Sequence, residues 1–290
     1  MKSLCIKLNN DKIVDYLLDT FLTSSLDSLY VSNYQFKIYN NIIVHYKGNN
    51  INSFYAYISE VLTNCIIYFY EDNLLKKLIE FNYFYFDLSE KNIIFDFCKE
   101  ELVKDFDSLN EKYSSIYNSF YNYLKENKAI VFDGFINFRL YNYMKLLDSV
   151  VDDSVNRYLI EREYNEFISI LKLYVNSSEC KTNNVHLIYT NKESILIDDN
   201  KNIISTKDYI LKAKYLSDIS FSSNDYTLNT LLNILPQKIT IHLVDNNKDE
   251  FINTLQLIFE NRITLCNDCK ICNIYKLKNN DFMNKINVKL

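Results

Sequence analysis

Glycine and proline are almost absent from this chain. Of its 290 residues only 2 are glycine and 1 is proline, and it has no tryptophan. The common phosphate-binding loops need several glycines close together, so neither kind of Gly-rich loop can be built here. The scarcity also removes most turn and linker signals, and we therefore place the parts of the chain from changes in hydrophobic period.

Three further features are missing from the sequence. No apolar run approaches the roughly 18 residues of a membrane-spanning helix, and the N-terminal residues lack the apolar core and cleavage site of a signal peptide. The net charge is −5, and acidic and basic residues are mixed along the chain, whereas nucleic-acid binding needs a clustered basic face. These absences predict a soluble cytoplasmic protein that binds neither membrane nor nucleic acid.

Apolar residues make up 48% of the chain, which is enough for a sizeable core. In the N-terminal part, residues 3–8 predict a strand and 10–24 a helix, and β-rich runs on both sides of Asn40-Asn41 predict a hairpin. Helical spacing follows from about 51 to 83 and from about 89 to 126. This pattern is typical of a small α/β lobe followed by helices.

Residues 133–176 predict a long central helix, which Asp133 could cap. Its apolar residues fall on two faces that are offset by one position, which indicates a bend or two different packing partners. One face holds Leu140, Met144, Leu147, Val151, Val155 and Leu159, and the other holds Ile160, Tyr164, Phe167, Leu171 and Tyr174.

After Ser177 the hydrophobic period changes from 3.6 to 2, and residues 185–204 predict a β-meander, followed by a helix over 224–234. Residues 236–265 then predict strand, helix, strand, with Asp245-Asn246-Asn247 capping the helix. A unit of this length implies a right-handed crossover between parallel strands. It would bring Asp245 beside Cys266 at the carboxyl edge, where open α/β sheets often bind ligands.

These elements together predict a mixed α/β protein of the α+β class. We expect an N-terminal α/β lobe with its following helices over residues 1–107, a central helical region over 108–178, and a C-terminal mixed sheet over 179–290.

The sharpest chemical motif is Cys266-x-x-Cys269-x-x-Cys272. Thiolates at this spacing can bind one ion from a tight turn, and three of them form the first part of a common iron–sulfur motif. Structural zinc needs four ligands, and the local sequence supplies only these three. The fourth candidates are Cys5, Cys180, His186, His242 or a second chain. The alternatives are a redox-active dithiol and ordinary thiols without a cofactor, and His242 is also typical of a buried, hydrogen-bonded strand histidine.

The central helix carries charged pairs at the interval of four that joins helix-surface residues. Arg157 precedes Glu161 and Arg162 precedes Glu166 by that interval. No Glu-x-x-His accompanies the acidic residues, so the di-iron bundle pattern is missing. We expect a solvated or partner-facing stripe, and we find no recognisable catalytic set in the sequence, which favours a protein that is not an enzyme.

Several segments resemble the YtxC-like family. They are Phe135-x-x-Phe138-Arg139-Leu140, Val150-Val151-Asp152-Asp153, the stretch from Glu161 to Val175, Pro236-x-Lys238-Ile239, and Arg262-Ile263-Thr264 with the three cysteines. The resemblance implies a soluble protein of endospore-forming Firmicutes that is linked to sporulation, and it brings no established activity or catalytic residue.

Two hypotheses follow. The first is a sporulation factor that acts through contact with a protein partner, with Arg157, Glu161, Arg162 and Glu166 as the interaction surface. The second is a metal- or redox-dependent protein that uses Cys266, Cys269 and Cys272 to hold zinc or an iron–sulfur cluster, with His242 as one candidate for the fourth ligand. A third, binding of a small ligand or nucleotide near Asp245, is disfavoured by the lack of a Gly-rich turn.

Overall fold

The computed structural model describes residues 1–24, 26–104, 106–190, 193–205, 222–245 and 247–276. The chain divides into two compact units, Met1–Glu161 and Arg162–Leu290. Each unit contains its own four-stranded mixed sheet and its own hydrophobic core. The α+β class expected from the sequence is confirmed.

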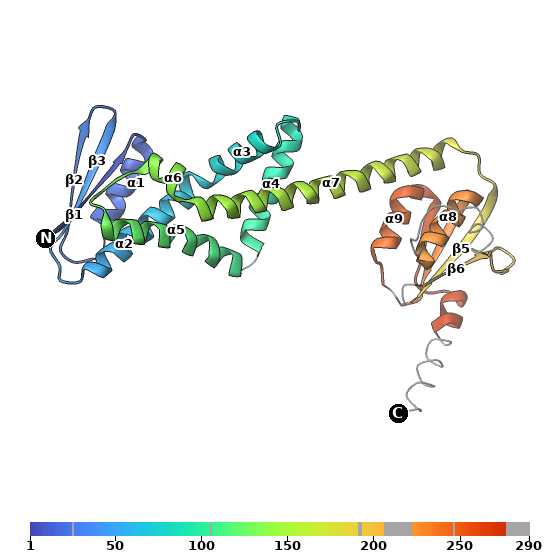
Figure 1. Cartoon of the computed structure of the whole chain (residues 1–290). Helices are drawn as coiled ribbons and strands as arrows, with labels where there is room; N and C mark the ends of the chain where they lie inside the picture. Colours follow the sequence, from blue (N-terminus) through green and yellow to red (C-terminus); the bar gives the residue numbers. More distant parts are fainter. Residues whose placement is uncertain (25, 105, 191–192, 206–221, 246, 277–290) are drawn as a thin grey trace, which may run out of the picture. The chain divides into compact units, whose positions relative to one another are not determined.

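The first unit begins with a sheet in the order β2-β3-β1-β4. Strands β2 (Leu29–Phe36) and β3 (Tyr39–Tyr46) form a hairpin, next to β1 (Lys2–Leu8) and helix α1 (Asp11–Leu22) (Figure 1). The short strand β4 (Ala129–Val131) pairs in parallel with β1 and was not predicted.

The turn of this hairpin corrects the sequence interpretation. It lies at Lys37-Ile38, where Lys37 has a φ of 56°, and Asn40 and Asn41 belong to β3. The side-chain amide of Asn41 donates to the backbone carbonyl of Tyr39 at 3.2 Å. The side-chain amide of Asn40 donates to the Asp11 carboxylate at 3.1 Å. The polar pair therefore marks the start of a paired strand and not a turn.

Helices complete the first unit around one core that includes Phe54, Leu62, Phe120 and Phe132. Inside it, Glu71 forms an ion pair with Lys112, whose Nζ lies 3.0 Å from the carboxylate, and accepts a hydrogen bond from the Tyr143 hydroxyl at 2.9 Å. All three residues are buried. The helices are α2 (Ile51–Phe69), α3 (Glu71–Asn82), α4 (Leu88–Lys104), α5 (Phe106–Glu126) and α6 (Phe132–Arg139).

Helix α7 (Tyr141–Ser177) is the long central helix. It is shorter than predicted because Leu140 is not helical and separates it from α6. Asp133 does not cap its start. The carboxylate of Asp133 instead accepts a hydrogen bond from the Tyr70 hydroxyl at 3.1 Å, and α6 begins without a side-chain cap.

The two apolar faces of α7 serve different cores. Leu147, Val151 and Val155 are buried in the core of the first unit, as the first predicted face requires. The second predicted face is right only in part. Leu171 packs against the core of the second unit, but Ile160 and Phe167 are exposed, and the buried residues there are Ile168 and Val175. The predicted and the observed residues both recur at helical spacing, so spacing alone does not decide which of them pack against the second core.

The second unit contains the sheet β6-β5-β7-β8. Strands β5 (Thr182–Thr190) and β6 (Glu193–Asp198) form the predicted hairpin, which Ile203 extends by a single bridge to Ile197. Helices α8 (Ser223–Ile234) and α9 (Glu250–Phe259) pack on this sheet (Figure 1). Strand β7 (Pro236–Leu243) lies parallel to both β5 and β8 (Ile263–Cys266), so the parallel strand–helix–strand unit is confirmed.

The helix between β7 and β8 is capped by a different residue from the one expected. The Asp249 carboxylate accepts from the backbone N–H of Ile252 at 3.3 Å, so Asp249, and not Asp245 to Asn247, is the N-cap of α9. The hydroxyl of Tyr189 also donates to Asp249, which ties the start of α9 to β5.

Alternation along the strands gives the second sheet two distinct faces. Leu187, Ile239 and Ile241 face the core that α8 and α9 cover. Ile188 and Val244, with the opposite parity, join a separate small cluster against the segment after β8. His242 shares the parity of Val244, so it lies on this second face. Within the described part of the chain, no helix is both long and apolar enough to cross a membrane.

Candidate metal centre

Four metal-ligand side chains converge on the second face of the C-terminal sheet. Cys266, Cys269, Cys272 and His242 each offer one donor atom, and these four atoms all lie within 4.8 Å of one another. The sequence alone placed the three sulfurs near one another, and the fold adds the imidazole.

The four donors come from two strands and from the segment that follows the second strand. The parallel register aligns His242 in β7 with Cys266 at the end of β8, which places both side chains on one face of the sheet. The chain then turns, and residues 270–276 are helical, which brings Cys269 and Cys272 back over that face. Cys272 is completely buried and His242 is 3% exposed.

Four of the six separations between the donor atoms are close to those around one tetrahedral ion. Cys266 Sγ and Cys272 Sγ are 3.9 Å apart, and Cys269 Sγ and Cys272 Sγ are 3.7 Å apart. His242 Nδ1 lies 3.3 Å from Cys269 Sγ and 3.5 Å from Cys272 Sγ. With Zn–S near 2.3 Å and Zn–N near 2.0 Å, tetrahedral geometry separates two sulfurs by about 3.8 Å and a sulfur from a nitrogen by about 3.5 Å.

The same separations also bear on the iron–sulfur cluster that the motif left open. All three cysteines are free thiols, which is compatible with metal binding and with a reduced dithiol alike. In a 4Fe–4S cluster each cysteine binds a different iron atom, and in a 2Fe–2S cluster two iron atoms share the four ligands. Three ligand sulfurs of a cluster therefore span more than one metal atom and lie farther apart than the ligands of a single ion. The donor set therefore fits zinc better than a cluster.

The donors differ in their pKa values in the metal-free site. Burial, together with the Cys269 thiol, raises the pKa of Cys272 to about 12. Burial also acts on Cys269, but hydrogen bonds from the Cys272 backbone and from neighbouring thiols outweigh it and lower its pKa. Burial and the adjacent His186 ring lower the pKa of His242, which keeps its imidazole neutral. A bound cation would allow the buried thiol to ionise as well.

A second histidine, His186, lies behind His242. Its Nδ1 is 3.0 Å from Nε2 of His242, and its own Nε2 is 3.7 Å from a carboxylate oxygen of Asp199. His186 thus contacts Nε2 of His242, the ring nitrogen that faces away from the cysteine sulfurs. Sequence reasoning named it only as a fourth-ligand candidate and missed Asp199, because their position depends on the pairing of β5 with β7.

Other residues singled out in the sequence lie elsewhere. The sequence predicted that Asp245 lies beside Cys266. In the structure the residue opposite Cys266 in the parallel pair is His242 and not Asp245. Asp245 follows the strand and accepts a hydrogen bond from Thr190 at 2.9 Å. Cys180 is exposed, and Cys5 belongs to the first unit. Neither is part of the four-donor group.

The charged positions on α7 form the ion pairs that their spacing indicates. Arg157 lies 3.0 Å from Glu161, and Arg162 lies 3.7 Å from Glu166. Arg157 also pairs with Glu100 of α4 at 2.7 Å and stacks over a phenylalanine ring of the same helix at 3.9 Å. Arg157 is therefore already engaged inside the first unit.

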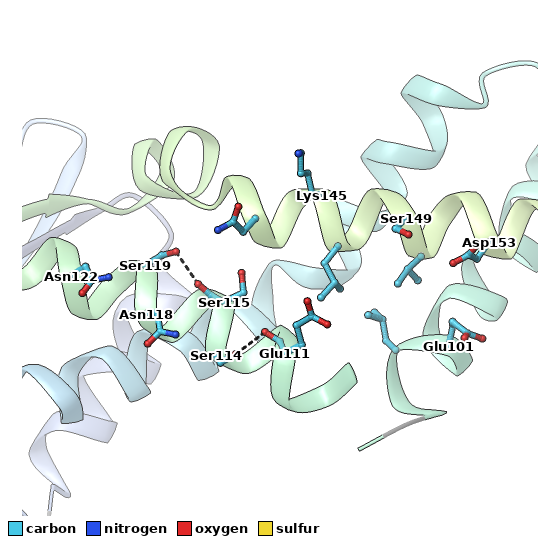
Figure 2. A pocket seen from close by; sticks show the side chains of 14 residues that line it. Glu101, Glu111, Ser114, Ser115, Asn118, Ser119, Asn122, Lys145, Ser149 and Asp153 are labelled. Atoms are coloured by element: carbon cyan, nitrogen blue, oxygen red, sulfur yellow. Dashed lines mark hydrogen bonds between the residues drawn. The ribbon is translucent and has the colours of Figure 1, made fainter. Parts of the chain in front are cut away.

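A groove of about 730 Å³ in the first unit is lined by polar residues of α4, α5 and α7 (Figure 2). Two of its serine hydroxyls donate to carbonyls of their own helix, from Ser114 to Glu111 and from Ser119 to Ser115. Its described lining contains acidic residues and Lys145 but neither histidine nor cysteine.

Comparison with known proteins agrees with the sequence resemblance. The sequence model of the YtxC-like family matches residues 56–264. The chain belongs to the YtxC-like family. A relative, "Uncharacterized protein YtxC" of Bacillus subtilis (strain 168), is 22% identical over 244 residues, which cover 78% of this chain and 85% of the relative. No solved structure matches the chain. The family match includes His242 but ends two residues before Cys266, so the case for a metal centre rests on the geometry.

Proposed function

We propose that the C-terminal unit of this YtxC-like protein holds one zinc ion through Cys266, Cys269, Cys272 and His242. The observation that carries this proposal is the convergence of three sulfurs and one imidazole nitrogen within 4.8 Å. Cys₃His is a common ligand set of structural zinc, and four protein ligands leave no open position for a catalytic water. The proposal is therefore a structural site and not a hydrolytic one.

The ion would fasten the segment after β8 to the sheet. Ile271 and Tyr275 of this segment pack against the small cluster of Ile188, Ile197 and Val244. That cluster is much smaller than the core on the opposite face, so hydrophobic burial alone gives the segment little stability. Two ligands come from the strands and two from the segment, and one ion would hold both.

Metal analysis of the purified protein tests this proposal. We expect one zinc per chain in the wild type and in the matched control Cys180→Ser, since Cys180 lies outside the donor group. Cys272→Ser should lose most of the zinc. Protein that is metal-free after anaerobic purification, and that does not bind added zinc, would contradict the proposal. A Cys269–Cys272 disulfide in such protein would favour the dithiol alternative.

We propose, second, that the protein acts in sporulation through contact with another protein. The observation that favours this is a group of apolar side chains exposed around the end of α3 and the start of α4. Phe81 and Phe84 are 84% and 75% exposed, and Tyr85 and Leu88 are 63% and 77% exposed. Exposed apolar patches of this kind are typical of protein contact sites.

Spore yield in an endospore-forming host tests this second proposal. Phe84→Ser should reduce spore yield while leaving the thermal stability of the purified protein unchanged, because the side chain is exposed. Alanine at Arg157, Glu161, Arg162 and Glu166 tests the charged stripe predicted from the sequence in the same assay. Normal spore yield from both variants, at normal protein levels, would contradict a contact through either surface.

A further inference from the structure

The imidazole of His242 is held from both sides. One ring nitrogen, Nδ1, lies 3.3 Å from the sulfur of Cys269, and the other, Nε2, lies 3.0 Å from Nδ1 of His186. The two rings are stacked with their centroids 5.3 Å apart. His186 Nε2 in turn lies 3.7 Å from a carboxylate oxygen of Asp199. The chain of groups runs from a turn after β6, through β5, to the donor in β7.

This order allows only one proton arrangement that leaves a ligand lone pair on His242. A neutral imidazole carries a proton on one nitrogen and a lone pair on the other. If Nδ1 of His242 binds the ion, its proton is on Nε2 and donates to Nδ1 of His186. The His186 proton is then on Nε2, facing the Asp199 carboxylate. At 3.7 Å that contact is too long for a full hydrogen bond, so Asp199 acts through its charge.

We propose that His186 and Asp199 are positioning residues that fix His242 as an Nδ1 ligand of the metal ion. The inference rests on the proposed zinc site and adds the groups that orient its single nitrogen ligand. Ligand histidines in metalloproteins commonly donate their second N–H to such a partner, which sets the tautomer and the ring orientation. Here the partner is a second histidine, and a carboxylate orients that histidine.

The wild-type protein allows a direct test, because the chain contains only three histidines. Long-range nitrogen–proton NMR spectra distinguish the two tautomers of each ring. In the zinc-loaded protein we expect His242 and His186 both to carry their proton on Nε2. A proton on Nδ1 of either ring in zinc-loaded protein would overturn the inference.

Variants at His186 test the same inference through zinc affinity, measured by competition with a chromophoric chelator. His186→Phe keeps a ring but cannot accept the proton of His242, and we expect zinc affinity to fall about 10- to 100-fold. His186→Gln offers an amide oxygen as acceptor and should restore most of the affinity. Asp199→Ala should have a smaller effect, and His45→Phe, which alters a histidine of the first unit, should have none.

The outcomes separate this inference from the zinc site itself. If the wild type binds no zinc, the proposed function fails and the inference fails with it. If the wild type and His186→Phe bind zinc equally tightly, the zinc site stands and the positioning role is wrong. If His186→Gln weakens binding as much as His186→Phe does, an acceptor at this position does not restore affinity, and the positioning role is wrong. If a variant does not fold, the tautomers measured by NMR in the zinc-loaded wild type still test the positioning role.

Discussion

Removing the metal should destabilise the C-terminal unit and leave the N-terminal unit unchanged. The perturbation is a strong chelator added to the zinc-loaded protein. All four proposed ligands lie within Arg162–Leu290, and the core of Met1–Glu161 is made entirely from its own residues. A ligand that binds only the folded form stabilises the unit that contains its site.

The expected magnitude follows from this linkage. At a free zinc concentration of about 100 times Kd, binding adds about 2.7 kcal/mol to the free energy of unfolding. For a unit of this size, 1 kcal/mol shifts the Tm by about 4 °C. Chelation should therefore lower the Tm of the C-terminal unit by about 10 °C, and a tighter site or more free zinc would increase the shift.

Differential scanning calorimetry with and without chelator measures this shift, provided that the two transitions are assigned. Lys112→Met serves for the assignment, because it removes the partner of the buried Glu71 in the first unit only. Lys112→Met should shift only the transition of the first unit. We expect the chelator to shift the other transition, which belongs to the C-terminal unit. An equal shift of both transitions, or no shift in protein shown to contain zinc, would refute the reasoning.

Two further predictions concern the buried groups. Lys112→Met leaves the Glu71 carboxylate buried without its charged partner, and urea unfolding of the first unit should show a loss of about 3–5 kcal/mol; an unchanged midpoint would mean that the pair contributes nothing. In metal-free protein, iodoacetamide should modify Cys269 before Cys272, because the pKa of Cys269 is lowered and that of Cys272 is raised. Peptide mass spectrometry measures the order of modification. Zinc should protect both thiols, while Cys180 should react equally with and without zinc. Faster modification of Cys272 than of Cys269 would contradict the assignment.

The sequence predicted most elements of this fold because hydrophobic period is a local property. The C-terminal hairpin, strand β3, α8 and the parallel unit around α9 follow directly from spacing and punctuation, whereas β2 was not predicted. The hairpin turn at Lys37-Ile38 was missed, since Asn40-Asn41 resembles a turn until its partners in the sheet are known. The domain boundaries expected near residues 107 and 178 stay a prediction. The two compact units of the structure meet between Glu161 and Arg162, within α7.

The candidate site shows where local reasoning ends. Cys266, Cys269 and Cys272 could be proposed from their spacing alone. His242 becomes the fourth donor only because β7 and β8 pair in parallel with His242 opposite Cys266, and the sequence does not specify that register. His186 depends in addition on the pairing of β5 with β7. The three cysteines were a local signal, and the fourth ligand is a property of the sheet.

X-ray absorption at the zinc edge of the purified wild-type protein tests the central claim most directly. The account predicts one zinc per chain with three sulfur ligands at about 2.3 Å and one nitrogen ligand at about 2.0–2.1 Å, and the loss of the nitrogen ligand in His242→Ala. A bound zinc with four sulfur ligands, or with oxygen ligands in place of the imidazole, would contradict it.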